Sequence, residues 1–243
     1  MKGKLYLQYF IVLLMLLNLV VPASASTYYK PRMDGGIKVE EERVKEEKNY
    51  LKVDLSIPRL TIPGNRELET EINKRLYEDA QAFKEGVEKD ALATYQQLIN
   101  KGVPVTPYEA VSKYVLHNSK DLLSLTVNYY QYTGGAHGDY IIKPYNYQIK
   151  TGKPLALKDF FKEGYDYKTI INNEIKKIIA KDPQNYFTDG FKSIRDDQEF
   201  FITPQGIVVY FQVYDIAPFA AGVPEFPIPF SKLKEGLVDS LVR

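Results

Sequence analysis

His137 is the residue on which a catalytic interpretation of this chain depends. It is one of only two histidines and lies in the glycine-rich stretch YTGGAHGDY. A histidine that acts as a general acid or base needs a carboxylate to orient its ring. Asp139 and Asp215 are the candidates, but residues two apart on a strand share a face without necessarily touching. The sequence also lacks a G-x-S-x-G nucleophile elbow, so we predict no catalytic residues.

The residue composition of the chain also argues against a metal site or a cofactor. Zinc sites use three or four His, Cys or carboxylate ligands. A chain with two His and no Cys would have to supply the remaining ligands from Asp and Glu. We therefore predict no metal site and no cofactor. The lack of cysteine also excludes disulfide bonds and lipoprotein attachment through a cysteine.

The glycines around His137 have two interpretations. Gly134, Gly135 and Gly138 allow positive φ and close approach of the backbone to another group. In the structural interpretation, they shape the loop and His137 hydrogen-bonds to the backbone to hold it. In the functional interpretation, the bare backbone lies against a ligand. The sequence leaves both open.

The segment DIAPFAAG, residues 215–222, is the second candidate site. Its apolar side chains would form a partner-binding patch if they were exposed, or a buried cap if they were tucked under the fold. The predicted binding residues come from this segment and from the glycine-rich loop with its flanks. They are Tyr132, Gly134, Gly135, His137, Asp139, Tyr140, Asp215, Pro218 and Phe219.

The glycine-rich loop is expected to join two strands. Residues 122–132 alternate apolar and polar side chains, which is the period-2 pattern of a half-buried strand. Residues 140–149 predict a second strand, closed by the turn KTGK at 150–153. The loop therefore lies at the end of a hairpin.

The rest of the chain predicts an α+β fold with antiparallel sheets. The apolar spacing predicts one long N-terminal helix at 66–100, capped by Asn65. We expect it to pack on a hairpin at 37–60, and a second helix, at 166–181, to pack on the C-terminal sheet. Other expected elements are a strand at 109–116, a polar turn at 117–121, a helical turn at 157–161, a hairpin at 200–211, an edge segment at 225–230 and a C-terminal helix at 233–242.

The first 25 residues have the pattern of a signal peptide. Lys2 and Lys4 precede an apolar run, and Ala23-Ser24-Ala25 supplies an A-x-A cleavage site. The competing interpretation is an uncleaved anchor, since the run is at the short limit for a membrane-spanning helix. Predicted cleavage after Ala25 would leave a flexible lead-in at 26–36. A hairpin-plus-helix unit at 37–102 and a unit at 103–243 that contains the GGAHG loop would follow.

Charge and aromatic content limit the classes of partner. The formal net charge is +1 and would be −1 without the two lysines of the leader. Nucleic acids and anionic membranes attract strongly basic surfaces, so we predict no nucleic-acid partner and membrane contact only through an uncleaved leader. The 20 Tyr and 12 Phe, with no Trp, suit either half-buried strands or a tyrosine-lined binding surface.

Three segments resemble a known family. They are YQYTGGAHG, then YNYQIKTGKPLALKDFF, and TPQGIVVYFQVYDIAPFAAG further on. They are similar to adjoining domains of unknown function that form the extracellular, lysozyme-binding region of the anti-sigma-V factor. The same domains precede the catalytic domain of some secreted peptidoglycan deacetylases. The resemblance covers residues 50–234, and it implies a fold and an envelope location more than a role, because neither a sigma-binding segment nor a deacetylase domain is seen.

We therefore predict a secreted, non-enzymatic binding or sensing domain at the bacterial cell envelope. Its expected partner is a protein, such as a lysozyme-like enzyme, or a cell-wall glycan. The alternative is an envelope hydrolase or carbohydrate-active enzyme that uses His137 with Asp139 or Asp215.

Overall fold

The computed structural model describes residues 36–119 and 121–238, all of which belong to one compact unit. The predicted signal peptide and nearly all of the predicted lead-in lie outside these residues. No helix in the described ranges is long and apolar enough to cross a membrane.

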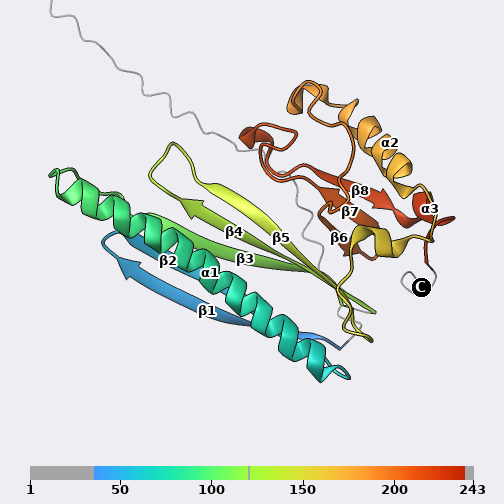
Figure 1. The fold of residues 1–243 in the computed structure, drawn as a ribbon, viewed down its shortest axis with the longest axis horizontal. Coiled ribbons are helices and arrows are strands. Elements are labelled where there is room, and N and C mark those ends of the chain that lie inside the picture. The colour runs from blue at the N-terminus through green and yellow to red at the C-terminus, as the bar shows by residue number, and fades with distance from the viewer. Residues whose placement is uncertain (1–35, 120, 239–243) are drawn as a thin grey trace, which may run out of the picture. The chain divides into compact units, whose positions relative to one another are not determined.

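Five strands form the larger sheet, in the order β1-β2-β3-β4-β5 (Figure 1). The predicted N-terminal hairpin is confirmed, because β1 pairs antiparallel with β2. The hairpin around the glycine-rich loop is confirmed as well, because β4 pairs antiparallel with β5. The strands are β1 (Lys38–Lys48), β2 (Leu51–Thr61), β3 (Tyr108–Ser119), β4 (Leu122–Tyr132) and β5 (Asp139–Gln148).

One pairing differs from the antiparallel prediction, since β3 runs parallel to β2. The helix between them, α1 (Arg66–Ile99), is the reason. It carries the chain back along the sheet, so that β3 starts at the same end as β2. The alternation of apolar residues fixes which face a strand buries but carries no information on its direction. The sheet also joins residues from both sides of Gly102, where the sequence predicts a boundary between units.

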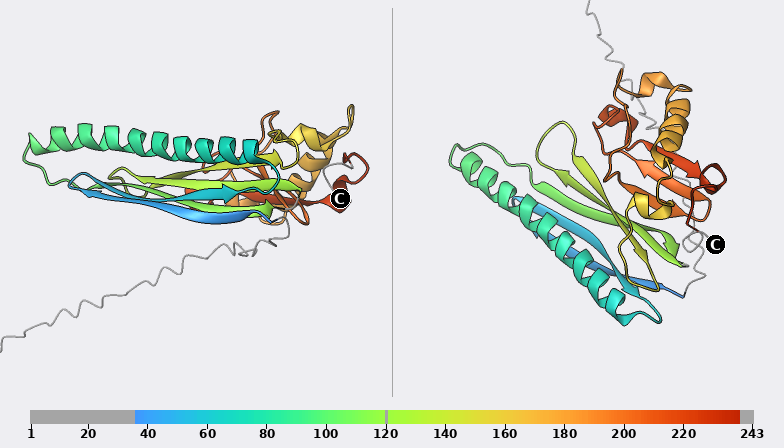
Figure 2. Two further views of the ribbon diagram at one scale, coloured as in Figure 1. Left: turned by 90° about the horizontal axis from the view of Figure 1, so that it is seen from below. Right: turned by 45° about the vertical axis from the view of Figure 1, so that its right-hand side comes forward.

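The helix α1 lies along one face of this sheet (Figure 2). The predicted N-cap is confirmed, because the Asn65 side chain accepts a hydrogen bond from the Leu68 amide at 3.0 Å. The buried stripe of α1 packs against Leu51, Val53 and Leu55 of β2 in one hydrophobic core. That stripe consists of Leu68, Ile72, Leu76, Ala80, Val87 and Ala91.

A second, antiparallel sheet follows in the order β6-β7-β8. The predicted helix is confirmed as α2 (Tyr167–Ile179), whose Ile171 and Ile175 share a core with Phe226 and Ile228 of β8. The predicted hairpin is β6–β7, and the predicted edge segment is the edge strand β8. The remaining elements are η1 (Leu157–Phe160), η2 (Pro183–Asn185), β6 (Phe200–Thr203), β7 (Gly206–Tyr210), η3 (Phe219–Ala221), β8 (Glu225–Pro229) and α3 (Phe230–Leu233).

Two local predictions are wrong. The polar run at 117–121 does not turn immediately, because β3 continues to Ser119 and His117 stacks on Phe201 with ring centroids 3.8 Å apart. Burial there lowers the pKa of His117 to about 4, so the ring is neutral at pH 7. The predicted C-terminal helix at 233–242 is replaced by the shorter α3, after which Leu237 forms a β-bridge with Phe161. Residues 239–242 of that prediction lie outside the described ranges.

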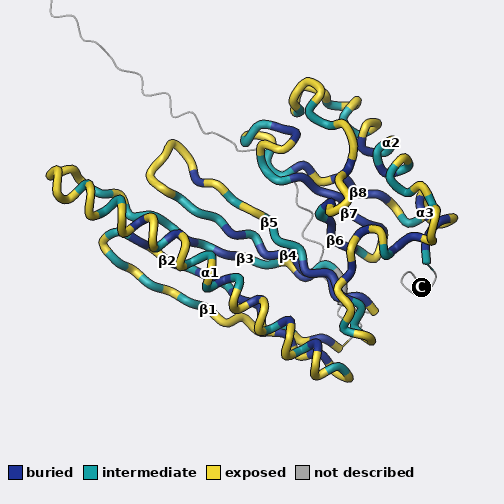
Figure 3. Tube along the Cα trace, viewed as in Figure 1, coloured by how far each residue is buried: buried dark blue, intermediate teal, exposed yellow. Residues whose placement is uncertain are grey.

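A buried polar network joins the two sheets. Ser124 of β4 donates to Asn146 of β5 at 2.7 Å, and Asn146 donates to the Phe200 carbonyl at 2.8 Å. Ser124 also accepts from the Ile202 amide at 2.8 Å. Ser124 and Asn146 are both buried, as are the strands at this junction (Figure 3). The network therefore fixes β6 against β4 and β5.

Candidate functional site

The glycine-rich loop and the DIAPFAAG segment meet in space. The His137 ring stacks on Phe219, with centroids 4.0 Å apart and an interplanar angle of 16°. Tyr140 meets the same Phe219 edge-on at 5.9 Å, and Tyr214 lies 6.0 Å from it. We call these four residues, His137, Tyr140, Tyr214 and Phe219, the aromatic cluster. Three of them come from two sequence segments predicted independently as sites.

Local backbone chemistry brings these side chains together. Gly134 has φ +88°, which favours glycine, and lets the chain leave β4 in a tight turn. Gly138 lies so close to the Tyr130 ring that a side chain at this position would overlap it. Gly222, with φ +72°, follows Ala221 and ends η3, the short helix that begins with Phe219. The glycines therefore serve backbone conformation and packing in the present fold.

The DIAPFAAG segment is neither fully exposed nor fully buried. Ile216 and Ala217 are buried and anchor the segment, whereas Phe219 is partly exposed. In the same cluster His137 is exposed and Tyr214 keeps 51% of its surface open to solvent. Large aromatic surfaces that stay accessible on a rigid base are typical of recognition sites.

The hydrogen bonds of His137 hold its ring in place. Nδ1 lies 2.7 Å from the Gly138 carbonyl oxygen, and Nε2 lies 3.4 Å from the Tyr214 hydroxyl. A carbonyl only accepts, so Nδ1 carries the proton in the neutral ring and Nε2 accepts from Tyr214. The bond to the Gly138 carbonyl is the backbone hydrogen bond that the structural interpretation of the loop predicts.

The two carboxylates of the catalytic alternative have other partners. Asp139 accepts from its neighbour, the Tyr140 amide, at 2.8 Å. Asp215 accepts from the Gln212 amide at 3.1 Å and from Arg195 at 3.4 Å. Neither carboxylate is a hydrogen-bond partner of His137 among the contacts of the described residues. In this geometry Asp215 closes the turn that leads into the DIAPFAAG segment.

The remaining predicted residues lie at the margin of the cluster. Tyr132 ends β4 opposite Glu109, Pro218 precedes the first residue of η3, and Gly135 is exposed. Sequence reasoning missed Tyr214, which has φ +69° and a largely exposed ring. Its position next to Asp215, an aromatic beside a predicted loop, is the signal that would have found it.

Gly134 and Gly135 differ in a way that permits a matched test. A substitution at Gly134 forces a side chain into positive φ, whereas Gly135 has no positive φ and its nearest neighbour is 3.7 Å from an added Cβ. We expect Gly134→Ala to lower the free energy of unfolding by about 1 kcal/mol. Gly135→Ala should change it by less than about 0.5 kcal/mol. Urea unfolding of both variants measures the difference, and equal losses would contradict the assigned role of Gly134.

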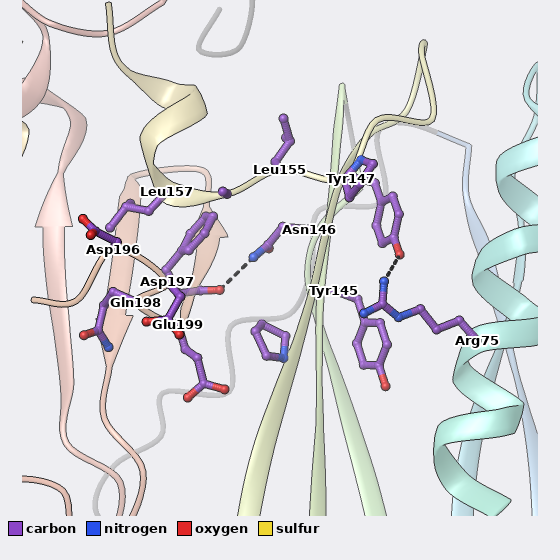
Figure 4. Close-up of a pocket in the computed structure, with 14 residues that line it drawn as sticks. Arg75, Tyr145, Asn146, Tyr147, Leu155, Leu157, Asp196, Asp197, Gln198 and Glu199 are labelled. Atoms are coloured by element: carbon purple, nitrogen blue, oxygen red, sulfur yellow. Dashed lines mark hydrogen bonds between the residues drawn. The ribbon is translucent and has the colours of Figure 1, made fainter. Parts of the chain in front are cut away.

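A groove follows the outer edge of β5 between α1 and residues 196–200, and we call it the β5 groove. One hollow of 280 Å³ is lined by Arg75, by β5 residues such as Tyr147, and by Glu199 (Figure 4). In that view Arg75 reaches the Tyr147 hydroxyl from α1, at 3.1 Å. A second hollow of 420 Å³ continues along β5 toward Tyr140 and also contains Glu199.

Glu199 is held at the centre of the groove. Its carboxylate accepts from Gln212 at 2.6 Å, and the same Gln212 amide bonds both backbone groups of Ile142, at 3.0 and 2.8 Å. Burial raises the pKa of Glu199 above its usual range. Sequence reasoning missed the groove, because its lining comes from α1, β5 and the segment before β6, which have no common motif.

Two family models match this chain in succession. Residues 44–140 match Deacetylase PdaC, and residues 158–231 match the protein family of unknown function DUF3298. Among curated proteins, the chain is 30% identical over 214 residues to the anti-sigma-V factor RsiV of Bacillus subtilis, covering 80% of this chain and 68% of RsiV. It is also 30% identical over 136 residues to the peptidoglycan-N-acetylmuramic acid deacetylase PdaC of B. subtilis. That match covers 53% of this chain and only 29% of the deacetylase.

Solved structures have the same fold. A DUF3298 family member from Bacteroides fragilis matches with a TM-score of 0.66 and 22% identity, covering 85% of this chain and 95% of that one. A DUF3298 family protein from Pseudomonas aeruginosa matches with a TM-score of 0.56 and 18% identity, covering 84% and 95%. These likenesses confirm the α+β architecture.

Proposed function

Because this chain belongs to the family of the anti-sigma-V factor RsiV, we propose that it is a non-enzymatic binding or sensing domain of the bacterial cell envelope. The observation that supports this role is the aromatic cluster, in which two separate loops present stacked and partly exposed rings. We further propose that the leader is cleaved after Ala25 and that the domain acts outside the membrane.

The proposed partner is a lysozyme-like enzyme that docks on the aromatic cluster. Aromatic anchors provide large contact area at low cost in side-chain entropy and dominate many protein interfaces. Phe219 already stacks on His137 at 4.0 Å without a partner present, so that its ring is positioned before binding. A rigid surface of this kind reduces the entropy lost on association.

A retention experiment tests this proposal. The purified protein is immobilised, and lysozyme and isolated cell wall are passed over it separately. We expect lysozyme to be retained, because the rings of the cluster would fill a concave surface on a protein partner. Retention of the cell wall alone would redirect the function toward glycan recognition. Failure to retain either would contradict the proposal.

The enzymatic alternative predicts a different experimental result. A hydrolase that used His137 would release products from cell-wall glycan, and His137→Ala would abolish the release while leaving the fold intact. If the chain is a binding domain, the unaltered protein should show no turnover. His137→Phe, which keeps an aromatic ring on Phe219, should retain lysozyme as well as the unaltered protein does.

A further inference from the structure

The larger hollow of the β5 groove has the size and lining of a small-ligand site. Its volume of 420 Å³ falls within the range of about 300–1,000 Å³ typical of such sites. The side that faces α1 is apolar, with Phe83 of α1 and Ile141 of β5, and Ile142 lines the hollow from the other face of β5. Ile141 keeps 59% of its surface exposed although it is a large apolar residue. Phe83 and Ile141 offer contact to the C–H faces of a ring-shaped ligand.

The polar side of the hollow is predominantly acidic. Asp79, Asp139 and Glu199 line it, against one cation, Lys143. Lys143 pairs with Asp79 at 2.8 Å, and Tyr145 donates to the same carboxylate at 2.8 Å. Asp139 and Glu199 have no such counter-charge within salt-bridge distance among the described residues. The charge of the hollow therefore complements a cationic ligand.

The backbone at the groove is closed to an extended peptide. A peptide that added to the edge of β5 would need free N–H and C=O groups along the strand. Both groups of Ile142 already bond the Gln212 side chain, and the Asn146 carbonyl accepts from the Leu155 amide at 2.9 Å. Pro144, between them, has no N–H to donate. A ligand must therefore be recognised by side chains.

We propose that the β5 groove binds an oligosaccharide whose amino sugars carry free ammonium groups, of the glucosamine type. The sugar rings pack on Phe83 and Ile141, while Glu199 and Asp139 face the ammonium groups and the hydroxyls. A cation beside Glu199 offsets the cost of keeping its carboxylate charged in a partly buried position. The groove adjoins the aromatic cluster, because Tyr140 also lines the larger hollow. Glu199 lies outside the cluster, and the inference does not rest on the proposed binding of lysozyme.

Calorimetric titration with a glucosamine tetramer tests the inference directly. We expect saturable binding that weakens as salt is raised, because the recognition is between charges. Glu199→Gln keeps an acceptor for Gln212, and Asp139→Asn keeps one for the Tyr140 amide, so both should fold. Each variant should weaken binding about tenfold, the effect of losing one charge-assisted hydrogen bond. The matched control is Asp90→Asn, an exposed carboxylate about three turns further along α1 than Asp79. It should bind like the unaltered protein.

Two comparison ligands identify the chemistry that is recognised. An N-acetylglucosamine tetramer has the same rings without the charge, and tetralysine has the charge without the rings. Both should bind at least about tenfold more weakly than the glucosamine tetramer. Equal binding of either one, no binding of the glucosamine tetramer, or binding that Glu199→Gln leaves unchanged would overturn the inference. Retention of lysozyme by Glu199→Gln should be normal, which separates this site from the proposed function.

Discussion

Replacing Asn146 with Leu is expected to lower the free energy of unfolding by about 3 kcal/mol. The substitution removes the acceptor of the Ser124 hydroxyl and the donor to the Phe200 carbonyl, both inside the junction of the two sheets. A buried polar group left without a partner costs about 1–3 kcal/mol, and leucine supplies no hydrogen bond to either group. Urea unfolding, followed by circular dichroism and by tyrosine fluorescence, measures the loss.

The control is a leucine in place of an exposed asparagine. Asn173 lies on the solvent side of α2, and Asn173→Leu should change stability by less than about 0.5 kcal/mol. Ser124→Ala removes another member of the network, so the double variant with Asn146→Leu should lose less than the sum of the two single losses. Additive losses would show that Ser124 and Asn146 act separately and would contradict the coupling between them.

The same variant links stability to function. The Asn146 bond reaches Phe200 of β6, and β6 pairs with β7, after which the chain enters the segment that carries Tyr214 and Phe219. His137, at the other side of the cluster, follows β4. The network at the junction therefore sets the relative position of the two loops, and its loss should reduce partner retention even at temperatures where the protein is folded.

Hydrophobic periodicity predicted the elements that bury one face. Leu51, Val53 and Leu55 alternate along β2, and the stripe of α1 recurs at helical spacing, because each element contacts the core from one side only. The prediction of a turn at His117 failed for a related reason. A polar residue type indicated exposure, whereas the ring lies in a buried stack on Phe201, a contact that depends on a strand far along the chain.

Each of the two loops of the site could be predicted from the sequence, but their contact in space could not. The glycines and DIAPFAAG are conspicuous in composition, so each loop was identified separately. The contact between His137 and Tyr214 joins residues 77 positions apart, and such a distance in sequence has no local pattern. The β5 groove was not predicted, because Asp79 and Glu199 each look like ordinary charged residues and acquire a common role only when α1 and the β6 segment lie beside β5.

Phe219→Ala is expected to weaken the binding of lysozyme about 100-fold, which corresponds to about 2.7 kcal/mol. Phe219 contacts His137, Tyr140 and Tyr214, so its removal eliminates the centre of the cluster and leaves the other rings without a common support. Because Phe219 is only partly buried, the melting temperature should fall by no more than about 2–4 °C, as for a loss of about 1 kcal/mol in a unit of this size. Titration calorimetry and thermal unfolding, performed on the same preparation, measure the two effects.

Two further variants serve as controls for Phe219→Ala. Tyr77→Ala removes an exposed aromatic, 47% accessible, from α1, and it should leave binding unchanged if the cluster alone forms the contact. His137→Phe keeps the stack on Phe219 but loses the bonds to the Gly138 carbonyl and the Tyr214 hydroxyl. We expect it to retain affinity within about threefold, since a rim hydrogen bond contributes less than a buried ring. The opposite result would be a large loss of affinity in His137→Phe and almost none in Phe219→Ala. It would show that the imidazole and not the ring surface carries the function, and it would support the catalytic alternative.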